Sequence, residues 1–168
     1  MSEITTPREL FLHELGDILY VERALVNEAL PKLIGEVQDN EFRTGLEKHL
    51  KQTEQHVANL ESVFESLNEE PEVEPCIGFD GLKDEHEKLV GETAPALIDL
   101  VDVGAAARTE NYEIAAYESL RRMAKGLGEQ QAVELLDANL KDEKETLREV
   151  EKIATRLSNE TAKQPSTA

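Results

Sequence analysis

The sequence predicts an all-α fold, an antiparallel four-helix bundle with a long crossover and a short extra helix between its second and third helices. Four long stretches repeat apolar residues at intervals of three and four, as one buried helix face does. Aromatic residues make up only 4% of the 168 residues and Trp is absent, which suits packed helices better than a sheet. A segment with two prolines at 68–79 divides the four stretches into two pairs. The sequence therefore indicates two helical hairpins joined by a crossover.

The first hairpin has clear start and stop signals. Thr6-Pro7-Arg8-Glu9 is a capping box with proline at the first helical position, so a helix is expected from Thr6 to about residue 35. Pro31 predicts a kink in this helix. After a short turn, Asp39 or Asn40 caps a second helix over residues 41–67.

The second hairpin follows the crossover. Asp80 is expected to cap a short helix over residues 80–90, and Pro95 marks the start of a third long helix that ends near Gly128. A fourth helix is expected over residues 129–157. One bundle domain would then span residues 6–158, with residues 159–168 as a flexible C-terminal tail.

Each long helix carries a polar interruption in its apolar face. The first has Glu22, and the fourth has Glu143. The third has Glu113 within a face made of Ile98, Val101, Ala105, Ala106, Thr109, Ala116 and Leu120. The face of the second is polar in its middle, at His49, Gln52, Thr53 and His56. When two residues face each other in an antiparallel hairpin, the mean of their residue numbers falls in the turn between the helices. The pairs Glu22–Thr53 and Glu113–Glu143 both satisfy this rule. All four polar interruptions are therefore expected at one level of the bundle.

The chemistry of this level favours a metal centre. A buried carboxylate costs free energy unless it is paired, hydrogen-bonded or bound to a metal. Inward-facing Glu and His side chains are typical of bundles that bind two Fe or Mn ions. Glu110 and Glu113 are about 4.5 Å apart along the helix axis, so both could reach two ions about 3.5–4 Å apart. The alternative is a metal-free cluster in which the acids share protons with the histidines and Tyr117.

The histidines and the cysteine have different expected roles. His49 and His56 are seven residues apart, or about 10.5 Å along the axis, so we expect His49 to bind the metal and His56 to lie beside the site. His13 and His86 fall outside the apolar faces and are expected at the surface. Cys76, the single cysteine, is expected to be a small packing residue.

Charge and composition exclude several classes of function. The formal net charge is −18, from 36 acidic and 18 basic side chains, and this field repels nucleic acids and anionic membranes. The chain has no apolar run long enough to span a bilayer and no basic-then-apolar N-terminus, so neither a membrane nor a secreted protein is expected. A single cysteine fits a reducing compartment. The sequence therefore predicts a cytoplasmic protein.

Motifs spread over residues 8–155 resemble those of a known family. They are Leu10–Leu15 with Asp17, Ala29–Lys32, His49-Leu50 with Thr53, Leu60-Glu61 with Val63-Phe64, Cys76 with Gly81-Leu82, Glu110 with Tyr112–Ala115 and Tyr117, and Glu143-Lys144 with Thr146. In these motifs the chain is similar to the ferritin-like YciE/YciF family of small stress-associated proteins. Two positions depart from the family pattern, since Gln52 stands where relatives usually have Glu and Asn111 where they usually have His. Thr146 stands where ferritin-like enzymes have a second ligating His.

The resemblance implies a ferritin-like bundle, a homodimer and a di-metal centre of one or two Fe or Mn ions. Its implied metal ligands are Glu22, His49, Glu110, Glu113 and Glu143. Around them it implies Gln52, Thr53, His56 and Tyr117. The function expected of such a centre is oxidation of Fe(II), or consumption of peroxide, with oxygen or peroxide as the small oxidant under stress. The alternative is a non-catalytic stress protein whose carboxylate cluster is metal-free or purely structural.

Overall fold

The computed structural model describes residues 3–73 and 75–163, and within these ranges every regular element is a helix. In chain order the elements are α1 (Pro7–Ala24), the π-helical turn η1 (Leu25–Ala29), α2 (Leu30–Glu36), α3 (Asn40–Ser66), α4 (Ile77–Glu92), the 3-10 turn η2 (Pro95–Leu97), α5 (Ile98–Leu127) and α6 (Gln130–Thr161). The prediction of an all-α fold is therefore confirmed.

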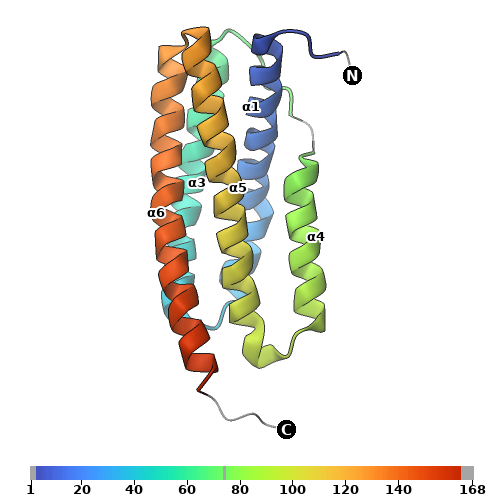
Figure 1. Ribbon diagram of the computed structural model, residues 1–168, viewed down its shortest axis with the longest axis vertical. Coiled ribbons are helices and arrows are strands. Elements are labelled where there is room, and N and C mark those ends of the chain that lie inside the picture. The colour runs from blue at the N-terminus through green and yellow to red at the C-terminus, as the bar shows by residue number, and fades with distance from the viewer. Residues whose placement is uncertain (1–2, 74, 164–168) are drawn as a thin grey trace.

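The four long helices α1, α3, α5 and α6 form a ring around a shared interior (Figure 1). Helix α1 contacts α3 and α5, and α6 contacts the same two helices. In Figure 1, α1 and α6 run downward while α3 and α5 run upward, so neighbours in the ring are antiparallel. The crossover after α3 thus makes α5 parallel to α3, as the sequence predicts.

The helix boundaries follow the expected local signals. At the start of α1 the hydroxyl of Thr6 accepts from the backbone N–H of Glu9, and both halves of the capping box are present. Asp39 caps α3 by accepting from the backbone N–H of Phe42 at 2.9 Å. Gly128 ends α5 in the left-handed conformation with φ of 80°, which glycine adopts without steric cost. These three boundaries agree with the sequence to within one or two residues.

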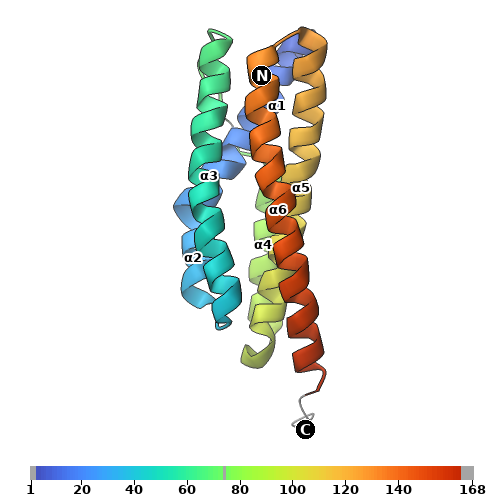
Figure 2. The same cartoon turned by 90° about the vertical axis from the view of Figure 1, so that its left-hand side faces the viewer.

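The kink predicted at Pro31 takes the form of the π-helical turn η1, which precedes the proline. There the backbone N–H of Leu30 donates to the carbonyl of Leu25, five residues earlier. Because Pro31 lacks an N–H and its ring crowds the carbonyl four residues before it, the preceding turn widens. Beyond this turn, α2 lies beside α3 (Figure 2).

The extra helix α4 is longer than predicted and packs on the outside of the ring, against α5 (Figure 1). It begins at Ile77 rather than at Asp80, with Cys76 at the N-cap position. The reason is that Phe79 is buried in the core, so the residues before Asp80 join the helix. Tyr20 of α1 donates to Asp80 at 3.0 Å, which ties α4 to α1 as well.

Two further contacts join α4 to α5. Nε2 of His86 lies 2.8 Å from Oδ1 of Asp102, which is only 1% exposed. His86 is half-buried, with its side chain 17% exposed, so it is less exposed than predicted, and the sequence did not identify Asp102 as a buried acid. The sulfur of Cys76 lies 2.9 Å from the hydroxyl of Tyr112, and its burial agrees with the predicted packing role.

The buried face of α5 differs from the predicted one. It consists of Asp102, Val103, Glu110, Glu113, Tyr117, Leu120 and Ala124. The predicted face residues Val101, Ala105 and Ala106 are only half-buried. The cause is α4, which covers a second side of α5, so that apolar residues occur on more than one face.

The last helix continues beyond its predicted end. Because α6 extends to Thr161, residues 159–161 belong to the helix and not to the predicted tail, whose residues 164–168 lie outside the described ranges. Among the described helices, none is both long enough and apolar enough to cross a lipid bilayer.

We expect Gly16→Ala to destabilise the protein, because α1 and the crossover approach closely there. A Cβ at Gly16 would lie 2.2 Å from the backbone oxygen of Glu72, so the free energy of unfolding should fall by about 1–3 kcal/mol. Gly45→Ala in α3 is the matched control, since its Cβ would meet nothing within 4 Å and should add about 0.5–1 kcal/mol of helix stability. Urea denaturation measures both, and equal effects would contradict the close approach.

Candidate metal centre

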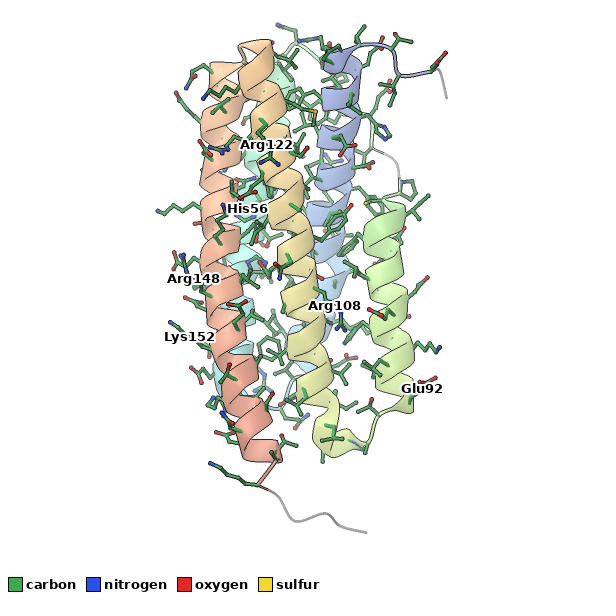
Figure 3. All side chains as sticks on the ribbon, in the orientation of Figure 1. His56, Glu92, Arg108, Arg122, Arg148 and Lys152 are labelled. Atoms are coloured by element: carbon green, nitrogen blue, oxygen red, sulfur yellow. The ribbon has the colours of Figure 1, made fainter. Side chains whose placement is uncertain are left out.

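Six side chains of the types that bind metals meet in the interior of the ring, and every helix of the ring contributes. They are Glu22 from α1, His49 and His56 from α3, Glu110 and Glu113 from α5, and Glu143 from α6, each at most 3% exposed. Figure 3 shows His56 near the middle of the bundle's length. The structure thus brings all five predicted ligands together with His56.

The donor atoms form two groups that share one residue. The His49 group consists of His49, Glu110, Glu113 and Glu143, and the His56 group consists of Glu22, His56 and Glu143. Within each group, one donor atom per residue lies within 4.8 Å of the others. Since a carboxylate has two oxygens, Glu143 could serve an ion in each group, as bridging carboxylates do in two-metal sites.

The ring of His49 is held so that one nitrogen faces the carboxylates. Nε2 lies 3.2 Å from Oε1 of Glu110 and 3.9 Å from Oε2 of Glu143. The opposite nitrogen, Nδ1, lies 3.2 Å from the hydroxyl of Thr146, and the hydroxyl of Thr53 donates to the backbone oxygen of His49 at 2.9 Å. Thr146 thus orients a candidate ligand, which is the role of polar groups around metal sites.

His56 lies within the cluster and not beside it. Its Nδ1 is 2.8 Å from Oε1 of Glu143 and 3.3 Å from Oε1 of Glu22. Its other nitrogen, Nε2, is 3.6 Å from Oδ2 of the half-buried Asp142. The spacing of seven residues suggested that the two imidazoles are too far apart, but they lean toward each other and their centroids are 6.4 Å apart. Both histidines are therefore candidate ligands.

A hydrogen-bond network supports the side of the cluster nearest α1. The hydroxyl of Tyr117 donates to Oε1 of Glu22, and the amide of Asn139 donates to the Tyr117 oxygen at 3.0 Å. Asn59 in turn donates to the amide oxygen of Asn139 at 2.7 Å. The sequence signal for this network was an amide, Asn139, within the apolar face of α6.

The residues predicted to surround the ligands differ in their positions. Thr53 and Tyr117 contact candidate ligands, as described above. Gln52 is half-buried, and within the described ranges its side-chain oxygen has no hydrogen-bond partner.

Burial and close charges set the protonation of the metal-free cluster. Burial raises the pKa of Glu110 and Glu113 well above the usual range, and the nearby charge of Glu143 raises both further. Burial would also raise the pKa of Glu143, but His56 and His49 hold it below its usual value. Burial lowers the pKa of His49. Burial would lower the pKa of His56 as well, yet contact with Glu143 raises it to about 10.

Several carboxylate oxygens of the cluster receive no hydrogen bond from the described residues. Among the described residues, both oxygens of Glu113, and Oε2 of Glu22, Glu110 and Glu143, are buried without a hydrogen bond, while Oε1 of Glu143 has His56 as its ion-pair partner. Buried polar atoms in proteins are nearly always hydrogen-bonded, so oxygens of this kind point to a cation as their partner. Four hard carboxylates and two imidazoles suit Fe or Mn. The residues present therefore fit a metal pair.

Comparison with known proteins assigns the chain to a family. Residues 6–163 match the model of DUF892, a domain of unknown function. The chain belongs to the DUF892 family. Protein YciF of Escherichia coli (strain K12) is 30% identical to this DUF892 protein over 143 residues, which cover 84% of this chain and 86% of YciF. The resemblance to the YciE/YciF family is thereby confirmed.

Solved structures share the fold of this DUF892 protein. The crystal structure of the E. coli stress protein YciF matches with a TM-score of 0.87 and 28% identity, covering 93% of this chain and 99% of that one. YcfI from Rhodopseudomonas palustris matches with a TM-score of 0.85 and 35% identity, covering 89% of this chain and 95% of that chain. The protein XCC3681 from Xanthomonas campestris pv. campestris, at 20% identity and a TM-score of 0.70, is similar in fold alone.

Proposed function

We propose that this DUF892 protein is a ferritin-like bundle that binds two Fe or Mn ions in its interior and oxidises Fe(II), with oxygen or peroxide, under stress. The observation that carries the proposal is Glu143, which belongs to both donor groups. Four carboxylates and two imidazoles are also the complement of ferritin-like di-iron and di-manganese proteins. Their distribution is different here, because both imidazoles come from α3.

The charge of the cluster supports two divalent ions. Its four carboxylates carry four negative charges when all are ionised, which two divalent cations would neutralise. Without metal, protons on Glu110, Glu113 and His56 offset three of these four charges, as the direction of their pKa shifts indicates. Metal binding would therefore release protons, and the binding free energy would add to the free energy of folding.

The surrounding residues would position the ligands and move protons. A bound Fe or Mn ion would supply the change of oxidation state that reaction with oxygen or peroxide requires. Tyr117 orients Glu22 through its hydroxyl, and Thr146 orients His49. Asp142 lies next to Nε2 of His56 and is partly exposed, so a proton that leaves His56 can reach solvent through it. The relative YciF is a stress protein, which agrees with a role in handling iron or peroxide.

Metal content tests the proposal. Protein reconstituted anaerobically with Fe(II) or Mn(II) and freed of unbound metal should contain about two ions per chain. Glu143→Gln should hold less than half of that, because it weakens both groups, whereas Glu151→Gln on the exposed side of α6 should match the wild type. Less than a tenth of an equivalent in the wild type would contradict the proposal.

Turnover separates the redox function from the alternative of a purely structural site. The Fe(II)-loaded protein should form Fe(III) on addition of oxygen or peroxide faster than the same Fe(II) concentration in buffer. Full metal content without this acceleration would instead support the non-catalytic stress protein.

A further inference from the structure

A cavity of about 330 Å³ leads from the surface, beneath α4, to the metal centre. Its inner end is lined by His49 and Glu110, which belong to the His49 group. Most of the remaining wall is apolar and comes from η1, α2, α3, α4 and α5. Its apolar residues include Leu25, Leu33, Leu46, Phe79, Leu82 and Ala106.

The cavity is a consequence of the fold. Ala105 and Ala106 give α5 two small side chains on the wall of the cavity, where larger ones would fill the space. On the other side, the π-helical turn contributes Leu25 and Ala29. An open cavity with a largely apolar wall and a few polar groups at its inner end is typical of small-molecule sites.

Charged side chains pair across the mouth of the cavity. Lys32 of α2 lies 3.0 Å from Glu87 of α4. Lys83 of α4 lies 3.7 Å from Glu28 of η1, and 3.1 Å from Asp80 of its own helix. Because both lysines already have carboxylate partners, the mouth offers little to an anionic head group. Exposed ion pairs of this kind are weak, so they can open to admit a ligand.

We propose that the cavity binds an uncharged aliphatic molecule, with its chain along the apolar wall and its inner end beside His49 and Glu110. The volume agrees with the lower end of small-molecule sites, about 300–1,000 Å³. The location next to a metal pair rests on the proposed function, whereas the binding itself rests on the cavity alone. The bound ligand would thus occupy the cavity that connects the surface to the candidate metal centre.

Fluorescence competition tests the binding. The metal-free full chain should bind N-phenyl-1-naphthylamine, an uncharged apolar fluorophore, in a saturable way, and 1-decanol should displace it. Ala106→Leu, which fills the cavity, should weaken the binding of 1-decanol by about tenfold or more. Ala105→Leu serves as a second filling variant, and Ala115→Leu on the exposed side of the same helix is the matched control.

Several results would overturn the proposal. They are the absence of saturable binding to the wild type, equal binding by both filling variants, an equal loss in Ala115→Leu, and tighter binding of decanoate than of 1-decanol. The last would mean that the site prefers an anion.

A metal readout keeps this proposal distinct from the proposed function. With Co(II) bound, saturating 1-decanol should shift the visible absorption of the ion, because the ligand ends beside His49. Alkanol binding without Co(II) uptake would support the cavity and contradict the metal site. Co(II) uptake without alkanol binding, or with a spectrum that bound alkanol leaves unchanged, would contradict the placement of the ligand.

Discussion

Replacing Glu113 by Leu should stabilise the metal-free protein and weaken its stabilisation by metal. Both carboxyl oxygens of Glu113 are buried without a hydrogen-bond partner, and burial raises its pKa well above the usual range. Leu removes this unpaired polar group, so in chelator the free energy of unfolding should rise by about 1–3 kcal/mol. The gain from metal, about 2.7 kcal/mol at a hundredfold excess over Kd, should become smaller, because the His49 group loses a ligand.

Glu143→Leu should have the opposite effect without metal. It removes the carboxylate that lies 2.8 Å from His56 and should lower the free energy of unfolding by about 3–5 kcal/mol, as the loss of one partner of a buried ion pair does. Urea denaturation of both variants, with chelator and with Fe(II), gives the comparison, and Glu151→Leu on the exposed side of α6 is the control. A loss of stability for Glu113→Leu in chelator would instead support the metal-free cluster.

The metal-free protein should lose stability as the pH rises from about 6.5 toward 10. The pKa of His56 is raised from 6.5 to about 10 in the folded protein. The contribution of His56 to the free energy of unfolding is therefore complete below pH 6.5. It is lost as the pH rises through the pKa of the folded protein, by about 3–5 kcal/mol in all. The raised pKa values of Glu110 and Glu113 act in the same direction, because these acids too must give up protons as the pH rises.

Thermal unfolding in chelator, measured at several pH values across this range, checks the expectation. His56→Gln should be less stable than the wild type at pH 7 but should show a much smaller slope. Fe(II) should reduce the decline in the wild type, because metal binding removes the same protons. An equally steep decline in His56→Gln would mean that His56 does not contribute to the pH dependence.

The sequence predicts most of the fold because its signals are local. The capping box at Thr6, the cap at Asp39 and the glycine at position 128 each act on neighbouring residues, and each marks a boundary that the structure has. The start of α4 could not be found in this way, because Phe79 joins the helix through burial in the core. The buried face of α5 was shifted for a related reason, since a helix covered on two sides has no single apolar face.

The acids of the candidate site could be predicted because a single Glu stands out within a helix face that is otherwise apolar. Asp102 gave no such signal, since its partner His86 comes from another helix and the predicted face of α5 excluded it. The predicted position of His56 was wrong, because the spacing of two residues along the helix axis describes the backbone and not the side chains. Its imidazole approaches that of His49 through side-chain conformations, which the packing of all four helices determines.

The six cluster residues are divided evenly between the two halves of the chain. Glu22, His49 and His56 precede the crossover, and Glu110, Glu113 and Glu143 follow it. Neither donor group is complete within one half. During synthesis the first hairpin therefore emerges without a complete donor group, so the affinity of the proposed site for metal would arise only in the last, longest-range step, when the hairpins dock. A half-folded chain would thus hold no metal at this site, and loading would report that assembly of the bundle is complete.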